Sequence, residues 1–336
     1  YNLQDCQLVL DIFAKTKVLD FLTLRSQLTG LELNRVGGSV AAFINLYLPK
    51  LHRAGYISPN RPVDGGLASP GGYVMTSQPG LYRNVLVLDF KSLYPSIIRT
   101  FKIDPLGLVE GLRQPEEAIQ GFKDALFSRE QHFLPDIITS LWQQRDTAKR
   151  HLDGARSQAI KILMNSFYGV LGSGGCPFYD TRLASSITLR GHEIMQTTAR
   201  WVEDLGYRVI YGDTDSIFVW LGDDMQAAQG HTVGTELQCE INRRWTRNIT
   251  EHHQLESYLE IEFETQFSRF LMPTIRGSEL GSKKRYAGLK LIENNEDELI
   301  FKGLESVRSD WTDMAKAFQL VLYQRVFADK DVKSYI

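Results

Sequence analysis

Apolar and polar residues along the chain alternate with two periods, one typical of helices and one typical of strands. Over residues 3–28 the apolar positions recur three and four residues apart, which predicts one or two helices. The same spacing, with Pro and Gly near the segment ends, predicts further helical segments. These are residues 39–46, 115–130, 135–151, 155–168 and 182–204. Gly206 closes the last of them.

Strands are predicted at three places. Residues 85–88 form a short continuous apolar run, which is typical of a buried strand, and this strand ends at Asp89. Residues 207–221 predict two strands joined by a turn that contains Asp213 and Asp215. Residues 258–264 alternate between apolar side chains and glutamates, which predicts a half-buried strand.

A Pro- and Gly-rich stretch over residues 58–80 predicts a long irregular connection, and 336 residues suggest about two domains. No apolar run approaches the roughly 18 residues of a membrane-spanning helix, so an integral membrane protein is excluded. The net charge of −2 neither favours nor excludes a nucleic-acid partner. Three cysteines without CxxC spacing argue against disulfides or a thiolate zinc site and favour a reducing cytoplasm. The chain starts at Tyr1 with no leader, and we expect a piece of a longer protein.

The three aspartates suggest a metal site. Asp89 lies at a strand end, whereas Asp213 and Asp215 lie in a turn between two strands. Neighbouring strands of one sheet can bring such ends together, and converging carboxylates repel unless a hard cation lies between them. Two Mg²⁺ ions held in this way would suit phosphoryl transfer. The alternative is that these aspartates only favour turns.

Two predicted helices carry cations and polar groups on one face. Arg145 and Lys149 are four residues apart, and Lys161, Asn165 and Tyr168 share the face of the next helix. The two helices could direct three cations at a triphosphate, and the apolar residues opposite should enter the core. The alternative is a solvated helix pair with ordinary surface charge.

A second basic cluster occupies residues 276–290, which contain five cationic side chains and one glutamate. Lys283, Lys284 and Tyr286 stand together within it, which suits a nucleic-acid backbone. A plain solvated loop is the alternative.

Five segments, in this order, resemble the motifs of family B DNA polymerases. They are Asp89-Phe-Lys-Ser-Leu-Tyr-Pro-Ser, Lys161-Ile-Leu-Met-Asn165-Ser-Phe-Tyr168-Gly, Tyr211-Gly-Asp-Thr-Asp-Ser, Lys283-Lys-Arg-Tyr and Lys302-Gly-Leu-Glu-Ser-Val-Arg-Ser-Asp. The match covers nearly the whole chain. The sequence around Ser69 and the short stretch between Lys149 and Lys161 are similar to a bacterial branch that acts in DNA repair or damage-tolerant replication.

The resemblance implies an α+β fold, with an antiparallel palm sheet, packed helices and an inserted helical fingers subdomain. It divides the chain into functional segments. These are the end of an exonuclease domain at 1–20, palm at 21–110 and 176–310, fingers at 111–175, and the start of a thumb at 311–336. We therefore expect most of the exonuclease and of the thumb to lie outside this sequence.

The resemblance also implies template-directed DNA synthesis from dNTPs with two Mg²⁺ ions, which Mn²⁺ can replace. Asp89, Asp215 and the Phe90 carbonyl are the expected metal ligands, and Asp213 is a further catalytic candidate. A larger set is expected to bind the nucleotide: Ser92, Leu93, Tyr94, Arg145, Lys149, Lys161, Asn165 and Tyr168. Another set is expected to bind primer–template DNA: Gly71, Gly72, Thr214, Lys283, Lys284 and Tyr286.

Tyr1 and Asp5 are similar to the last exonuclease motif, Tyr-x₃-Asp, so 3′→5′ exonuclease activity is expected only in a full-length protein. A sliding clamp is a further partner implied by the resemblance, through a tail that is not in this sequence. Ser69 replaces the Tyr of a Tyr-x-Gly-Gly loop that contacts template DNA in many members. An RNA-templated polymerase and a nucleic-acid-binding module without catalysis are the rival functions.

Overall fold

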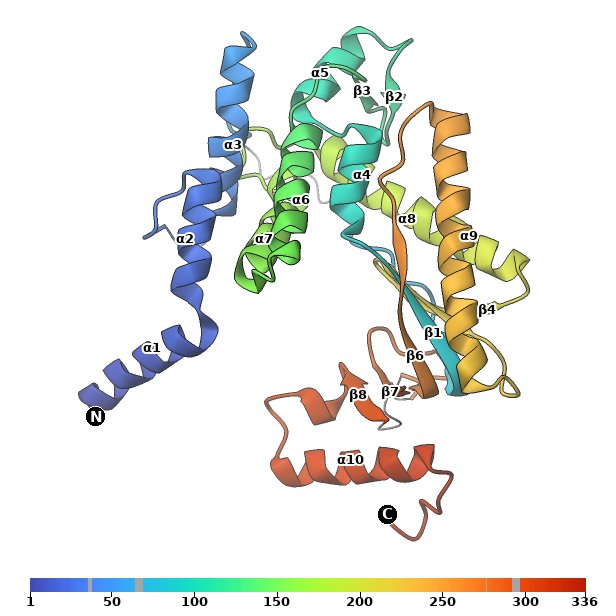
Figure 1. Ribbon diagram of the computed structural model, residues 1–336. Coiled ribbons are helices and arrows are strands. Elements are labelled where there is room, and N and C mark those ends of the chain that lie inside the picture. The colour runs from blue at the N-terminus through green and yellow to red at the C-terminus, as the bar shows by residue number, and fades with distance from the viewer. Residues whose placement is uncertain (36–37, 64–68, 276, 292–296) are drawn as a thin grey trace. The chain divides into compact units, whose positions relative to one another are not determined.

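The computed structural model describes residues 1–35, 38–63, 69–275, 277–291 and 297–336 (Figure 1). Part of the predicted connection at 58–80 and Arg276 of the second basic cluster lie outside these described residues. The fold is α+β, as predicted, and its principal sheet is antiparallel. The chain divides into two compact units, of which the first comprises Tyr1–Gly71 and Ser92–Arg190. The second comprises Gly72–Lys91 and Gly191–Ile336, and the expected functional segments stay a prediction.

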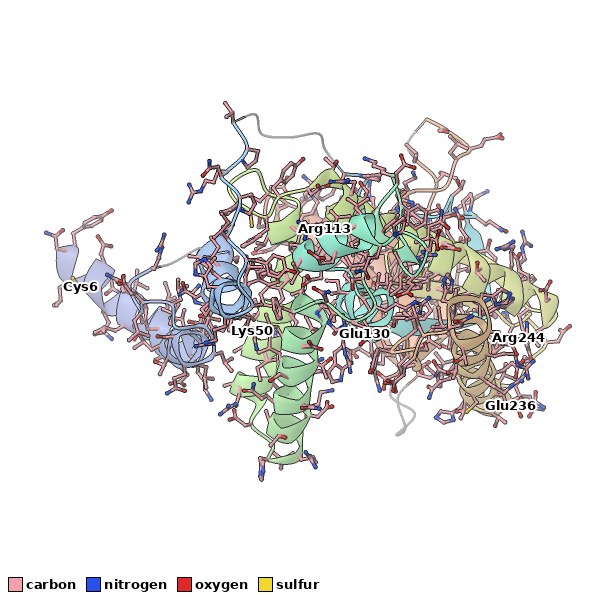
Figure 2. The ribbon with its side chains drawn as sticks, turned by 90° about the horizontal axis from the view of Figure 1, so that it is seen from above. Cys6, Lys50, Arg113, Glu130, Glu236 and Arg244 are labelled. Carbon is pink, nitrogen blue, oxygen red and sulfur yellow. The ribbon has the colours of Figure 1, made fainter. Side chains whose placement is uncertain are left out.

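The second unit is built on a sheet of six antiparallel strands in the order β4-β5-β1-β6-β7-β8. The strands are β1 (Gly80–Phe90), β4 (Arg208–Asp213), β5 (Ser216–Trp220), β6 (Ile261–Met272), β7 (Tyr286–Lys290) and β8 (Glu298–Lys302). β1 contains the predicted apolar run, and its residues 85–88 are at most 3% exposed. These residues are buried because β1 lies inside the sheet and the long helix α9 (Ala227–His253) packs on β1 and β6. Glu236 and Arg244 of α9 are labelled in Figure 2. Arg244 Nε lies 2.7 Å from Glu240 Oε1 of the same helix.

The first unit is mainly helical in the described residues. Its helices are α1 (Asn2–Thr16), α2 (Val18–Thr29), α3 (Ser39–Arg53), α4 (Leu93–Phe101), α5 (Pro105–Arg113), α6 (Leu134–Arg150) and α7 (Gly154–Leu171). α8 (Thr181–Asp204) contributes residues to both units, and the second unit also has the short helix η1 (Glu305–Val307) and α10 (Asp313–Phe327). None of the described helices has the length and apolarity needed to cross a membrane.

Most of the predicted elements are confirmed. Residues 3–28 form two helices, and the predicted helices at 135–151, 155–168 and 182–204 correspond to α6, α7 and α8. The helix predicted over 115–130 is wrong, because that segment folds into a small hairpin of β2 (Ile119–Gln120) and β3 (Leu126–Phe127). Lys123 and Asp124, between the two strands, have left-handed φ angles of 55° and 61°, which a right-handed helix cannot contain.

Candidate active site

A tight acidic turn joins β4 to β5. Thr214 lies at its apex with a left-handed φ of 58°, which costs a non-glycine residue about 1–3 kcal/mol. The Thr214 N–H donates to the Tyr73 carbonyl at 2.7 Å, and the Asp215 N–H donates to the Asp213 carbonyl at 2.6 Å. These bonds hold Asp213 and Asp215 at fixed places on either side of the apex.

The sheet brings Asp89 and Asp215 to neighbouring strand ends. β1 and β5 are antiparallel, and Asp89 lies directly opposite Ser216. The Ser216 hydroxyl donates to Asp89 Oδ2 at 2.6 Å, and the Phe90 N–H donates to the Asp215 carbonyl at 2.9 Å. Both acids are therefore fixed by the same strand pair within the second unit.

Asp213 has a cationic partner. Lys284 Nζ lies 2.7 Å from Asp213 Oδ1, and the Lys284 N–H donates to the Tyr211 hydroxyl at 2.8 Å. Close packing fixes the Lys284 backbone, because a Cβ at Gly303 would lie only 2.3 Å from the Lys284 carbonyl oxygen. Lys284 thus compensates the charge of Asp213.

Glu262 lies opposite Asp89 on the other side of β1. Its carboxylate pairs with Lys91, which also binds Glu260 at 2.6 Å. The Glu262 side chain is 48% exposed, as expected for the solvated face of a strand.

The donor set of the two strand ends suits a hard divalent cation. Asp89 and Asp215 supply carboxylate oxygens and Phe90, next to Asp89, supplies a backbone carbonyl, which are ligand types that Mg²⁺ prefers. Among the described residues, no group of three or more His, Cys, Asp or Glu side chains is arranged to hold a metal. Two carboxylates and one carbonyl would leave part of the coordination shell of such an ion to water and substrate oxygens.

A pocket of about 380 Å³ opens beside the acidic turn in the second unit. Asp213, Thr214 and Asp215 line one part of it, and Lys284 and Lys302 line another. The pocket therefore combines acids with two cations, a charge pattern that suits a phosphate-containing ligand next to a metal.

The helix α4 of the first unit starts just after the strand that carries Asp89. Ser92 has a left-handed φ of 46° and precedes the first helical residue, so the N–H groups of Leu93 and Tyr94 belong to the open first turn. Pro95 fits this turn, where its missing N–H is not needed. The ring of Tyr94 lies 4.7 Å from the ring of Tyr168 on α7, at an interplanar angle of 52°. Burial raises the pKa of the Tyr168 hydroxyl.

The predicted cationic helices α6 and α7 pack against each other in the first unit. Lys149, Lys161 and Asn165 are exposed, and Arg145 is half-buried. The opposite face of α7 enters the core as predicted, with four residues at most 5% exposed: Ile160, Leu163, Met164 and Phe167. The structure thus gives α7 one polar and one buried face.

Tyr286 has an environment that the sequence did not reveal. Its ring packs 5.2 Å from Phe218 and 5.1 Å from Phe270, and burial, with the nearby acidic charge of Glu264, raises its pKa to about 12. Lys283 is exposed beside it. The expected DNA contacts of these residues and of Thr214 stay predictions.

The remaining predicted residues lie near the ends of other segments. Gly71 is exposed, and the nearby Ser69 hydroxyl lies 3.2 Å from that of Ser185 and 3.3 Å from that of Thr188. Gly72 is the first residue of the second unit.

The candidate exonuclease residues lie at the start of the first unit. Asp5 lies in α1, which has no buried residue, and its N–H donates to the Tyr1 carbonyl at 3.2 Å. The structure therefore places this pair on an exposed helix.

Sequence reasoning missed the roles of Ser216 and Lys91. Ser216 follows Asp215 directly, so its position one strand away from Asp89 could have been found from the predicted antiparallel pairing. Lys91 follows the strand that carries Asp89, but its pairing with Glu260 and Glu262 joins segments about 170 residues apart. No local pattern reports such a contact.

Comparison with known proteins agrees with this geometry. The whole chain is 55% identical to DNA polymerase II of Escherichia coli over 338 residues and covers 43% of that protein. It is 31% identical over 86% of its length to a DNA polymerase of Thermococcus gorgonarius, and covers 37% of it. Over 85% of its length it is 29% identical to a DNA polymerase of Archaeoglobus fulgidus, and covers 34% of it. The chain spans less than half the length of these relatives.

The expected similarity to a bacterial branch of the family is confirmed by the match to DNA polymerase II of E. coli. The sequence profile described as DNA polymerase family B matches residues 37–336, which include the acidic turn, β1, α7 and β7. The chain therefore belongs to DNA polymerase family B.

Proposed function

We propose that this chain carries a polymerase centre that adds dNTPs to a primer 3′-hydroxyl under the direction of a DNA template. The observation that carries the proposal is the pairing of β1 with β5, which fixes Asp89 and Asp215 at adjacent strand ends. Membership of family B and the similarity to E. coli DNA polymerase II support it. The resemblance adds DNA repair or damage-tolerant replication as the setting.

Asp89, Asp215 and the Phe90 carbonyl would hold Mg²⁺, or Mn²⁺ in its place. When bound, such ions lower the pKa of a primer hydroxyl and stabilise the charge on a departing pyrophosphate. The Ser216 hydroxyl keeps the Asp89 carboxylate in one orientation by its 2.6 Å bond. Lys284 neutralises Asp213, so Asp213 orients the turn and Lys284 rather than supplying a principal metal ligand.

The first unit would bind the incoming nucleotide. The N–H groups of Ser92 and Leu93, at the start of α4, would face the triphosphate, and Arg145, Lys149 and Lys161 would supply cations to it. Tyr94, fixed against Tyr168, excludes a ribose 2′-hydroxyl. Asn165 and Tyr168 line the pocket for the new base pair.

Primer–template DNA would bind through the remaining predicted residues. Lys283 offers an exposed cation to the backbone, while Lys284 and Tyr286 hold the shape of the pocket beside the acidic turn. Thr214, Gly71 and Gly72 would add backbone contacts without base specificity. A sliding clamp remains a proposed partner of a longer protein.

Primer extension with metal-ligand variants tests the proposal. Asp89→Asn and Asp215→Asn should each lower extension in Mg²⁺ by roughly a thousandfold, because loss of a charged ligand costs several kcal/mol of transition-state stabilisation. Primer–template affinity, measured by fluorescence anisotropy, should stay within a factor of about three. The assay uses this chain and a chimaera in which it replaces the matching region of E. coli DNA polymerase II.

Glu262→Gln is the matched control, because it removes an exposed carboxylate opposite Asp89 that is paired with Lys91. This variant should extend primers normally. Extension by Asp89→Asn or Asp215→Asn at the wild-type rate would contradict the assignment. Wild-type proteins that bind DNA but never extend a primer would instead favour the binding module without catalysis.

A further inference from the structure

A buried carboxylate in the first unit is not used by the proposed chemistry. Asp104 is 0% exposed and lies between α4 and α5. Asp104 Oδ1 accepts from the Tyr47 hydroxyl and from the Gly107 N–H, both at 2.8 Å. Asp104 Oδ2 accepts from the Phe133 N–H at 3.0 Å and from the Leu134 N–H at 2.7 Å. A single side chain therefore joins three separate segments of the unit.

Helix α6 has no N-terminal cap of its own. Its N-cap residue is Phe133, whose side chain cannot accept a hydrogen bond, and Pro135 has no N–H. The N–H groups of Phe133 and Leu134 are satisfied by Asp104, which lies 30 residues earlier in the chain. The same carboxylate is the ordinary N-cap of α5 through Gly107. Two helix N-termini, each with partial positive charge, thus converge on one anion.

A second contact ties α4 to α6. Arg99 Nε donates to the Thr139 hydroxyl at 3.0 Å, and the Arg99 guanidinium lies 4.9 Å from the ring of Trp142. α4 begins at the N–H groups that we propose to bind the triphosphate, and it ends at Phe101, shortly before Asp104. The first half of α6 is therefore fixed to the end of α4.

We propose that Asp104 is a positioning residue for nucleotide binding. It fixes the N-terminus of α6 and thereby the positions of Arg145 and Lys149 on that helix. This inference rests on the proposed function. With a rise of about 1.5 Å per residue, Arg145 lies about 16 Å along the helix from Leu134. A small tilt at the N-terminus of α6 therefore displaces Arg145 more than it displaces Leu134. A misplacement of about 1 Å at a binding group is enough to cost binding or rate.

The test compares variants that separate the two caps. Asp104→Ser keeps a hydroxyl that can cap α5 through Gly107, but a serine is too short to reach Phe133 and Leu134 as well. Asp104→Asn is the isosteric variant, and its NH₂ group would face N–H donors. The matched control is Tyr47→Phe, which removes the hydroxyl that donates to Asp104 Oδ1 and accepts from the Leu106 N–H. It leaves Oδ2 with its donors Phe133 and Leu134, and it keeps the ring that packs 5.9 Å from the ring of Phe133.

Amide hydrogen exchange on the chain measures the cap directly. In Asp104→Ser the amides of Phe133 and Leu134 should exchange about tenfold faster or more, as expected for a lost cap, whereas that of Gly107 should change little. Tyr47→Phe should leave the Phe133 and Leu134 amides as in the wild type. Unchanged exchange at these two amides in Asp104→Ser would overturn the inference.

Single-nucleotide incorporation by the chimaera measures the positioning. Asp104→Ser should raise the KM for dNTP by about tenfold, with kcat and DNA affinity within about twofold, while Tyr47→Phe should leave the KM within about twofold. An unchanged KM, or an equal rise in both variants, would overturn the positioning role and leave only a structural one. If the wild-type chimaera does not incorporate dNTP at all, the proposed function fails, and hydrogen exchange still decides whether Asp104 caps α6.

Discussion

Three non-glycine residues of the proposed centre have a left-handed backbone, Ser92 in the first unit and Thr214 and Lys284 in the second. Ser92 precedes α4 and Thr214 separates the two aspartates of the turn, with φ angles of 46° and 58°. Strain of this kind persists only where the surrounding contacts impose it, and it is concentrated at functional sites. At Thr214 those contacts include the bond to Tyr73, and they fix the directions of Asp213 and Asp215 before any ligand binds.

Removal of the Tyr94 ring should relax sugar selection. In Tyr94→Ala the side chain no longer packs against Tyr168, and the space beneath the sugar can accept a hydroxyl. The ratio of rNTP to dNTP incorporation should rise by about tenfold to a hundredfold, the range that one pocket contact can supply. Single-nucleotide incorporation kinetics on the chimaera provide the measurement.

Tyr168→Phe is the control for this change, because it keeps the second ring and removes only its hydroxyl. It should leave the ratio unchanged. A Tyr94→Ala variant that loses stability and uses both sugars equally poorly would show that Tyr94 is a core aromatic residue and nothing more.

Tyr286 predicts a loss of stability at alkaline pH. Its pKa is raised to about 12 in the folded protein against about 10 in the unfolded chain, so the stabilisation is complete below pH 10 and is lost as pH rises from about 10 to 12. Tyr286→Phe removes this titration. Its free energy of unfolding should therefore fall less steeply with pH over that interval than that of the wild type.

Urea unfolding between pH 8 and about pH 12, together with tyrosinate absorbance, measures this difference. Tyr335→Phe is a suitable control, because Tyr335 is near the end of the chain and packs there against Phe318, away from Tyr286 and its neighbours in the sheet. Parallel pH profiles for the wild type and Tyr286→Phe would contradict the prediction.

At the scale of elements, the turn after β8 packs closely against Lys284, which contacts Tyr211 and Asp213 of the strand before the acidic turn. Gly303 has a φ of +61°, and a Cβ there would collide with the Lys284 carbonyl. Gly303→Ala should therefore destabilise the protein by about 1–3 kcal/mol and displace Lys284 from Asp213. Thermal unfolding and the KM for primer–template DNA should both change.

Gly222→Ala is the control for Gly303→Ala, because it introduces backbone strain without a steric collision. Gly222 has a φ of +96°, but a Cβ there would meet no atom within 4 Å. This variant should lose stability without any change in the KM for DNA. Equal effects of the two substitutions on DNA binding would show that Lys284 is not held by Gly303.

The sequence predicted those elements whose pattern is local. α6, α7 and α8 were found because each has an apolar face and a Pro or Gly near its end, and the acidic turn was found because its residues are adjacent. α9 was missed, although it has 27 residues. Its pattern is interrupted by Gly230 and Gly234, where a Cβ would collide with Gln266 and Phe263 of β6. Only the packed structure explains these glycines.

The hairpin at 115–130 shows the same limit. Helix propensity is outweighed there by packing against α5, because a Cβ at Gly111 would lie 2.3 Å from the Leu126 carbonyl oxygen.

In the candidate site, Asp89 and Asp215 could be predicted from short motifs. Two contacts could not be predicted in this way. Lys284 binds Asp213, which lies 71 positions earlier in the chain, and Asp104 caps α6 at Leu134, which lies 30 positions later.

At the scale of the whole molecule, each compact unit is assembled from two separate stretches of the chain. The residues expected for an exonuclease, Tyr1 and Asp5, lie in the first stretch, in or next to a helix that buries none of its side chains. Two-metal hydrolysis requires several converging carboxylates. Among the described residues none is grouped in that way around Asp5.

This chain should consequently show no 3′→5′ exonuclease activity. A labelled primer incubated with the purified chain in Mg²⁺ or Mn²⁺ should keep its length. E. coli DNA polymerase II serves as the comparison under the same conditions. Progressive shortening by the chain, abolished by Asp5→Ala, would reveal a nuclease centre within these 336 residues.

The place of β1 inside the sheet also affects how the protein is made. Val85 is paired with Phe267, which the ribosome adds 182 residues later. At about 5–20 residues per second, the apolar strand waits roughly ten to forty seconds for that partner. During this time its edges can pair with other nascent chains. The arrangement that holds Asp89 rigidly in the finished protein therefore leaves its strand open to misassociation during translation.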